Sequence, residues 1–246
     1  MPLPYRTALV TGASSGIGRA VAAALAGAGT AVLAVGRDAA ALASLHDACG
    51  AKPIRADVRD GAAMAAIFAD HDIDLLVNNA GTLLARGPFQ SNDADAIDGM
   101  VAVNLTAPLH LARLALPGMI AAGHGHLVFI GSSAGRTAHP DLAVYGATKA
   151  AISHFCDSLR GDLLGTGVRV SEIAPGRVRS RLYRDTIGLD AVDAALYDGR
   201  APIEPADIAA LLLTVLAAPA NVDVSRIEMF PTTQAIAGTR LHRTGG

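Results

Sequence analysis

A serine, a tyrosine and a lysine in the middle of the chain have the types and the spacing of a proton-transfer site. Tyr145 and Lys149 are four residues apart at the start of a helical pattern, so their side chains share one helix face. A free tyrosine has a pKa of ~10, and a neighbouring ammonium lowers that pKa by stabilising the phenolate. Ser132 supplies a hydroxyl that can hydrogen-bond a developing oxyanion. These residues predict proton exchange with a carbonyl or alcohol oxygen, coupled to hydride transfer by a redox cofactor.

A glycine-rich turn near the start of the chain predicts a nucleotide site. The turn Thr11-Gly12-Ala13-Ser14-Ser15-Gly16-Ile17-Gly18 follows a strand-like run and opens a helical pattern. Glycines let the backbone approach a pyrophosphate closely, and the N–H groups of a helix N-terminus bind its oxygens. A lone glycine motif is weak evidence, but a position between the first strand and a helix is the context that a dinucleotide site requires.

The residues at the end of the second predicted strand indicate whether NAD or NADP binds. NAD sites place an acidic residue there, against the ribose 2′-hydroxyl, whereas an arginine suits the 2′-phosphate of NADP. The chain has Gly36 and then Arg37 at this point, which favours NADP(H) over NAD(H). Asp38 is the counter-evidence, because it could act as a shifted ribose ligand. In the alternative interpretation, Arg37 and Asp38 are ordinary charges at the start of a helix.

Short apolar runs alternate with longer alanine-rich helical stretches, and this alternation sets the expected fold. Runs such as AVLAVG and HLVFIG are typical of parallel strands covered on both faces. We expect one α/β domain over residues 1–246 with a doubly wound parallel sheet. The irregular stretch Pro175–Pro202 predicts a substrate lid at about residues 176–203. The expected strands are Thr7–Thr11, Ala31–Gly36, Pro53–Val58, Ile73–Asn78, His126–Gly131, Arg169–Ile173 and Arg226–Phe230, and the expected helices are Ile17–Gly27, Ala39–Ala48, Gly61–Ala69, Asp93–Ala121, Val144–Leu164 and Pro205–Ala217.

Composition narrows the class of protein. Of 246 residues, 51% are hydrophobic, and the net charge is −2 without the basic clusters that bind nucleic acid. Two cysteines, Cys49 and Cys156, predict reduced thiols in a cytoplasmic protein. We find no signal-peptide pattern, no apolar run of membrane-spanning length and no metal-ligand spacing around His124 and His126. We therefore expect a partner that is a small molecule, and we interpret His139 as an ordinary loop residue.

A set of motifs spread along the chain identifies a family. The motifs are TGASSGIG at 11–18, Asp57-Val58, NNAG at 78–81, Asn104, GSSAG at 131–135, YGATK at 145–149 and PGRVRS at 175–180. With them the chain resembles the short-chain dehydrogenase/reductase family over nearly its full length. This resemblance implies a single-domain α/β fold of the Rossmann type. The TGxxxGxG spacing and the short length are similar to members that have no added C-terminal substrate domain.

The resemblance implies a role for each matching residue. Asn104 would hold a water that relays protons past Lys149, although an asparagine inside a helix can also satisfy a backbone group. Ser132 matches the catalytic serine, with Ser133 as the neighbouring alternative, and Asp57 would contact the adenine amino group. The implied catalytic residues are Asn104, Ser132, Tyr145 and Lys149. The implied cofactor-binding residues are Gly12, Ser14, Ser15, Gly16, Ile17, Gly18, Arg37, Asp57, Val58, Asn79, Ala80, Gly81, Tyr145, Lys149, Pro175, Gly176, Val178 and Ser180.

The C-terminal motif IEMFPTTQAIAG at 227–238 is similar to that of the serine/3-hydroxy acid dehydrogenase subfamily. Members of this subfamily act on small hydroxy acids or semialdehydes, and most use NADP(H). Because such substrates are anionic, we expect an arginine to bind their carboxylate or sulfonate beside Ser132 and Tyr145. The candidates are Arg181 and Arg184, with Arg177, Arg179 and Arg136 as further possibilities. Alternatively these arginines are solvated or bind cofactor phosphate, and an apolar or aromatic carbonyl compound binds among Leu182, Tyr183, Ile187, Leu189 and Tyr197.

The resemblance also implies a homotetramer assembled through the helices Asp93–Ala121 and Val144–Leu164. Two rival classes of function stay open. One is a redox-inactive cofactor sensor on the same fold, which typically lacks the tyrosine or the lysine. The other is a lyase or epimerase that uses the same tyrosine. The presence of both Tyr145 and Lys149 argues against the sensor. Product formation without net NADP(H) turnover would indicate the lyase or epimerase.

Overall fold

Seven apolar segments form one parallel sheet in the computed structural model, which describes residues 3–183 and 201–235. The strand order is β3-β2-β1-β4-β5-β6-β7, and every neighbouring pair is parallel. This order confirms the single-domain, doubly wound α/β fold that the sequence predicts. The strands are β1 (Thr7–Thr11), β2 (Ala31–Gly36), β3 (Lys52–Arg55), β4 (Leu75–Asn78), β5 (Gly125–Ile130), β6 (Val168–Pro175) and β7 (Arg226–Met229).

The expected strand Pro53–Val58 ends earlier than predicted, at Arg55. The carboxylate of Asp57 accepts a hydrogen bond from the backbone N–H of Arg59 at 2.9 Å, which turns the chain out of the sheet. The residues after β3 are therefore free to line the edge of the sheet instead of extending it.

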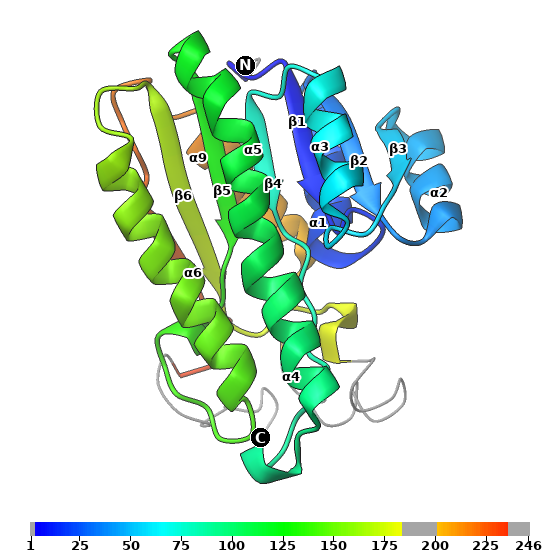
Figure 1. The fold of residues 1–246 in the computed structure, drawn as a ribbon, viewed down its shortest axis with the longest axis vertical. Coiled ribbons are helices and arrows are strands. Elements are labelled where there is room, and N and C mark those ends of the chain that lie inside the picture. The colour runs from blue at the N-terminus through cyan, green and yellow to red at the C-terminus, as the bar shows by residue number, and fades with distance from the viewer. Residues whose placement is uncertain (1–2, 184–200, 236–246) are drawn as a thin grey trace.

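Helices cover both faces of the sheet (Figure 1). On one face, Leu25, Leu42 and Leu212 belong to a buried cluster with residues of β1, β2 and β4. On the other face, Met64, Leu111 and Ile152 belong to a second buried cluster. The first set of helices is α1 (Gly16–Gly27), α2 (Ala39–Cys49) and α9 (Pro205–Leu216), and the second is α3 (Gly61–Asp70), α4 (Ala94–Val101), α5 (Ala107–Ala122) and α6 (Ala143–Asp162). In Figure 1, α4, α5 and α6 lie on the near side of the sheet.

The expected helix Asp93–Ala121 is continuous but irregular, because a π-helical segment, Ala102–Thr106, joins α4 to α5. One series of buried residues in this helix is spaced by four, at Ala96, Met100, Asn104, Pro108 and Ala112. Ala107, Leu111, Ala115 and Met119 are buried as well. An α-helix has about 3.6 residues per turn, so a spacing of four would slowly rotate the buried side toward solvent. The wider π turn absorbs this excess and keeps Asn104 on the buried side.

By length and composition alone, the helix Ala94–Ala122 could cross a membrane, since it has 29 residues and contains a sufficiently apolar stretch. The expectation that no apolar run has this length is therefore wrong. The same helix packs on β4 and β5 through α5, so we interpret it as part of the layer that covers the sheet.

The carboxyl ends of the parallel strands define one edge of the sheet, and the winding direction reverses between β1 and β4. Ligands of doubly wound folds bind at this point, because the loops that follow the two strands diverge there. The glycine-rich turn follows β1 and the NNAG segment follows β4. The fold thus brings both motifs to the place where a dinucleotide site is expected.

The two ends of the predicted lid lie side by side. Val178 and Ile203 form a parallel β-bridge, and the N–H of Arg179 donates to the Ile203 carbonyl at 2.9 Å. The N–H of Ile203 donates in turn to the Arg177 carbonyl at 3.0 Å. Most of the predicted lid, including residues 184–200, lies outside the described residues.

Candidate active site

A cleft of about 340 Å³ runs along the carboxyl edge of the sheet and reaches Tyr145 and Lys149. Most residues of the predicted cofactor set line it, namely Gly12, Ser14, Ser15, Gly16, Ile17, Arg37, Asp57, Val58, Asn79, Ala80, Gly81, Tyr145, Lys149 and Ser180. Four others do not line this cleft. Gly18 and Val178 are buried behind the cleft wall, Pro175 ends β6, and Gly176 lines a second, smaller cavity.

The glycine-rich turn has room for a ligand because glycines, which have no side chain, occupy the points where the backbone segments approach most closely. Gly12 has φ +66° and Gly16 has φ +53°, a region that favours glycine. A Cβ on Gly12 would lie 2.9 Å from Nδ2 of Asn79, and one on Gly18 would overlap the Gly12 carbonyl. The glycines therefore let the turn, the helix start and the NNAG segment approach one another closely.

The N-terminus of α1 suits an anion. Among the described residues, no side chain caps this helix, and its first turn contains no acidic residue. The first N–H groups of a helix have no partner inside the helix, and the helix dipole favours negative charge at this end. Together with the glycine contacts, this helix start fits the pyrophosphate of a dinucleotide.

Hydrogen bonds fasten the NNAG segment to the end of β1. Oγ1 of Thr11 accepts from the backbone N–H groups of Asn79 and Ala80, both at 3.0 Å. Nδ2 of Asn79 donates to the Thr11 carbonyl at 2.8 Å. These bonds cross-link the loops that follow β1 and β4, so the two walls of the cleft are held at a fixed separation.

The far end of the cleft carries two arginines. Arg37 and Arg59 both line it, and Gly36 leaves its wall without an acidic side chain at the end of β2. Asp38, the counter-evidence for NADP(H), does not line the cleft. Its carboxylate accepts from the N–H of Ala41 at 3.0 Å and caps α2.

Asp57 is already paired with one of these arginines. Its carboxylate accepts hydrogen bonds from Arg59 at 2.7 and 3.0 Å. These bonds and the nearby Arg37 charge lower the pKa of Asp57 to about 2. Sequence reasoning identified Asp57 and missed Arg59, although Arg59 stands only two residues further along the chain.

Tyr145 and Lys149 are both buried at the inner end of the cleft. Nζ of Lys149 lies 5.8 Å from the centre of the Tyr145 ring. The same Nζ donates to the Ile130 carbonyl at 2.8 Å, which fixes its position against β5. Burial lowers the pKa of Lys149 to about 8, because the low-dielectric surroundings disfavour the ammonium.

Asn104 lies behind this pair in the π segment. Its Oδ1 accepts from the Thr82 N–H at 2.8 Å, and its Nδ2 donates to the Thr82 carbonyl at 2.9 Å. Nδ2 also lies 3.4 Å from the Thr148 hydroxyl on α6. The side chain thus satisfies backbone groups, as the alternative interpretation of this asparagine expects, and it ties the π segment to the loop after β4.

Ser132 lies in a second cavity of about 100 Å³. Its hydroxyl oxygen accepts from the Ala134 N–H at 3.2 Å and caps the short 3₁₀ helix Ser133–Gly135. Ser133, the alternative, lines the same cavity. The lining residues are Arg86, Ser132, Ser133, Ala134, His139, Pro140, Leu142, Gly176, Arg177 and Gln234. His139, which we interpreted as an ordinary loop residue, therefore belongs to this cavity.

Of the arginines predicted as substrate anchors, some form ion pairs with glutamates and others line a cavity. Arg179 pairs with Glu204 at 2.8 Å and Arg136 pairs with Glu228 at 3.3 Å. Arg181 lines the large cleft, and Arg177 lines the small cavity. Arg184 lies outside the described residues.

The structure describes only part of the alternative pocket for an apolar or aromatic substrate. Leu182 lines the large cleft, whereas Ile187, Leu189 and Tyr197 lie outside the described residues. Within residues 3–183 and 201–235, no group of three or more His, Cys, Asp or Glu side chains could hold a metal ion.

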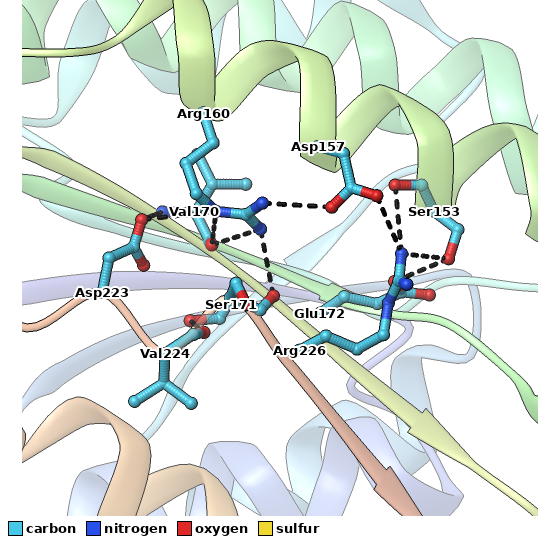
Figure 2. Close-up of polar contacts among 10 residues, drawn as sticks. Ser153, Asp157, Arg160, Val170, Ser171, Glu172, Asp223, Val224 and Arg226 are labelled. Atoms are coloured by element: carbon cyan, nitrogen blue, oxygen red, sulfur yellow. Dashed lines mark hydrogen bonds and ion pairs between the residues drawn. The ribbon is translucent and has the colours of Figure 1, made fainter.

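A buried carboxylate, that of Glu172, is held by neighbouring polar side chains (Figure 2). Glu172 on β6 accepts from the Ser153 hydroxyl on α6 and from Nε of Arg226 on β7, both at 2.7 Å. Its other oxygen lies against Gly131, where a Cβ would overlap it. Gly131 follows Ile130, the residue that accepts the hydrogen bond from Lys149. The negative charge of Glu172 raises the pKa of Lys149 and so opposes the effect of burial.

Comparison with known proteins decides the family. A family model described as short chain dehydrogenase matches residues 6–187. The chain belongs to the short-chain dehydrogenase/reductase family. This family assignment makes the protein an oxidoreductase and confirms the resemblance that the sequence motifs indicate.

Several members of this family cover nearly the whole chain. An uncharacterised short-chain type dehydrogenase/reductase of Sinorhizobium fredii, y4eK, is 46% identical over 97% of this chain and 96% of its own length. The NADP-dependent 3-hydroxy acid dehydrogenase YdfG of Escherichia coli is 36% identical, over 96% of this chain and 98% of its own. The closed form of a serine dehydrogenase with NADP+ superposes with a TM-score of 0.91 at 35% identity, over 96% of this chain and 99% of that one.

We expect the substitution Glu172→Gln to lower the pKa of Lys149, because it removes the negative charge that opposes the effect of burial. The chain has only two lysines, Lys52 and Lys149, so lysine-selective ¹³C labelling followed by NMR titration resolves both. A decrease of about 0.5 or more in the Lys149 value is the expected result.

The control for this titration is Asp157→Asn. Asp157 also contacts Arg226, at 3.3 Å, but its side chain is 54% exposed. This variant should leave the Lys149 titration close to that of the wild type. An unchanged Lys149 pKa in the Glu172→Gln protein would show that the two groups are not coupled.

Proposed function

We propose that the protein is an NADP(H)-dependent oxidoreductase that interconverts a small 3-hydroxy acid and its carbonyl form, or a related semialdehyde. The observation that carries the proposal is the buried Tyr145–Lys149 pair at the inner end of a cleft suited to a dinucleotide. Similarity to the NADP-dependent 3-hydroxy acid and serine dehydrogenases supports the substrate class.

Lys149, Tyr145 and Ser132 have different roles in the proposed proton transfer. The Lys149 ammonium stabilises negative charge that develops on the Tyr145 oxygen. Tyr145 then gives a proton to the substrate carbonyl oxygen, or takes one from the hydroxyl in the oxidative direction. Ser132 donates a hydrogen bond to the same oxygen as charge develops on it. When bound, the nicotinamide cofactor supplies or accepts the hydride.

Loss of the Tyr145 hydroxyl should abolish turnover. NADPH formation should be followed with serine, 3-hydroxy acids, hydroxysulfonates and aromatic alcohols as substrates. We expect turnover of one of the anionic hydroxy compounds, and a decrease of roughly 10²–10⁴-fold in kcat for Tyr145→Phe because general acid–base catalysis is lost.

Binding of NADP+ to the Tyr145→Phe variant serves as the control for folding. Activity of that variant near the wild-type rate would contradict the mechanism. Oxidation of the aromatic alcohols alone would replace the proposed substrate class by the apolar alternative, for which Leu182 in the cleft is the supporting observation.

The NADP(H) preference follows from the charges at the far end of the cleft. Arg37 and Arg59 line it, and Asp38 is engaged in capping α2. A ribose 2′-phosphate would be stabilised there by the Arg37 guanidinium, beside the Arg59–Asp57 ion pair. A ribose 2′-hydroxyl finds no unpaired acceptor at the end of β2 among the described residues.

Arg37→Ala should therefore reduce kcat/KM for NADPH roughly tenfold or more while leaving kcat/KM for NADH nearly unchanged. The matched control is Arg55→Ala, because Arg55 is an exposed arginine at the end of β3 that does not line the cleft. Equal loss with both cofactors, or a wild-type preference for NADH, would contradict the proposal.

We also propose that the protein is a cytoplasmic homotetramer assembled through the α4–α5 and α6 helices. Only 33% of the most apolar window of the helix Ala94–Ala122 is buried within the chain, and Ile120 near its end is 44% exposed. A second copy would cover this apolar surface.

Light scattering should give a particle of four chains, each of 24.9 kDa. A monomer at micromolar concentration would reject the assembly.

A further inference from the structure

We propose that Arg86 binds the carboxylate of the substrate in the small cavity beside Ser132. The inference rests on the proposed function and adds the residue that selects an anionic substrate. Arg86 lies in the loop that follows the NNAG segment, outside every motif of the family and outside the set of lid arginines.

Two loops meet to hold Arg86 at this cavity. The N–H of Gly87 donates to the Asp141 carbonyl at 3.1 Å, which joins the loop after β4 to the segment before α6. Both residues have a positive φ, +126° at Gly87 and +68° at Asp141. A non-glycine residue in this region is uncommon and is found where the surroundings enforce it. The loop junction is thus a defined structure, and Arg86 lines the same cavity as His139 and Pro140.

The charge balance of the cavity favours an anion. None of the ten described residues that line it is acidic, whereas Arg86 and Arg177 are both cationic. Arg86 forms no ion pair within residues 3–183 and 201–235, in contrast to Arg136 and Arg179, which pair with glutamates. Arg86 is an exposed residue that lines the cavity. A guanidinium can bind a carboxylate through two parallel hydrogen bonds.

Arg177 contributes to the same environment without replacing Arg86. Its backbone N–H donates to Oε1 of Gln234 at 2.8 Å, and it makes further contacts of its own. Burial and the charge of Arg177 lower the pKa of His139, which favours the neutral imidazole. His139 can then hydrogen-bond a polar ligand, and Arg86 supplies the charge.

The size of the cavity restricts the ligand further. Its volume is about 100 Å³, compared with ~300–1,000 Å³ for the sites of drug-sized ligands. Ser132 and Arg86 line this one small space, so a substrate that reaches both carries its reacting oxygen and its carboxylate only a few bonds apart. A 3-hydroxy acid or the matching semialdehyde has this arrangement.

The first test compares an acid with its uncharged analogue. Arg86→Ala should lower kcat/KM for the 3-hydroxy acid by roughly tenfold to a hundredfold, because a charge-assisted contact is lost. The value for the methyl ester of the same acid should change less than about twofold, since the ester has no carboxylate. Arg136→Ala is the matched control, because Arg136 is a nearby arginine that pairs with Glu228 and does not line the cavity. Equal losses for acid and ester would overturn the proposal.

The second test does not need turnover. Malonate, a small dicarboxylate, should bind the NADP+-loaded wild-type protein in calorimetry, and Arg86→Ala should weaken its Kd roughly tenfold or more. Arg136→Ala should leave the Kd unchanged. If malonate binding depends on Arg86 but no hydroxy acid is oxidised, the proposed function fails and the anion site stands. If wild type and Arg86→Ala bind malonate equally, or neither binds it, Arg86 is not the anchor.

Discussion

The buried ammonium of Lys149 is the constraint on which the site depends. An ammonium taken out of water loses its hydration, and the resulting cost either shifts its pKa or is met by other polar groups. Here the Ile130 carbonyl accepts from Nζ at 2.8 Å, and the buried Glu172 supplies negative charge from the next strand. Glu172 is in turn held by Ser153 and Arg226. Strands β5, β6 and β7 and helix α6 therefore share one electrostatic network that ends at Lys149.

Backbone groups and glycine residues shape most of the cleft around this lysine. The close approach at Gly12 and the bonds from Thr11 to the NNAG segment fix the cleft walls. Charged side chains are concentrated at its two ends, with Arg37 and Arg59 at one and Arg86 and Arg177 around the adjoining small cavity. The middle of the cleft suits a feature common to all dinucleotides, whereas the charged groups are those to which we assign the proposed selection of cofactor and substrate.

The fold and most of the cofactor cleft could be predicted from the sequence, because they depend on local patterns. Apolar runs and helix starts identify all seven strands, and the glycine-rich turn identifies the nucleotide site. Contacts between distant segments could not be predicted in this way. Arg86 and Gln234 stand far apart in the chain, and only the folded loops bring them to one cavity. Glu172 reads as one polar residue in a strand, and its effect on Lys149 depends on the sheet order.

The π segment could not be predicted from the sequence, because a helical pattern does not show which of its residues are buried at a spacing of four, as those from Ala96 to Ala112 are. The segment also has a practical consequence for protein engineering. Regular α-helix is the more favourable backbone, so a design procedure that optimises melting temperature would remove the wide turn at Ala102–Thr106. Straightening that helix would rotate Asn104 away from Thr82 and Thr148 and loosen the loop that leads to Arg86. The more stable protein would be the one with the less ordered pocket.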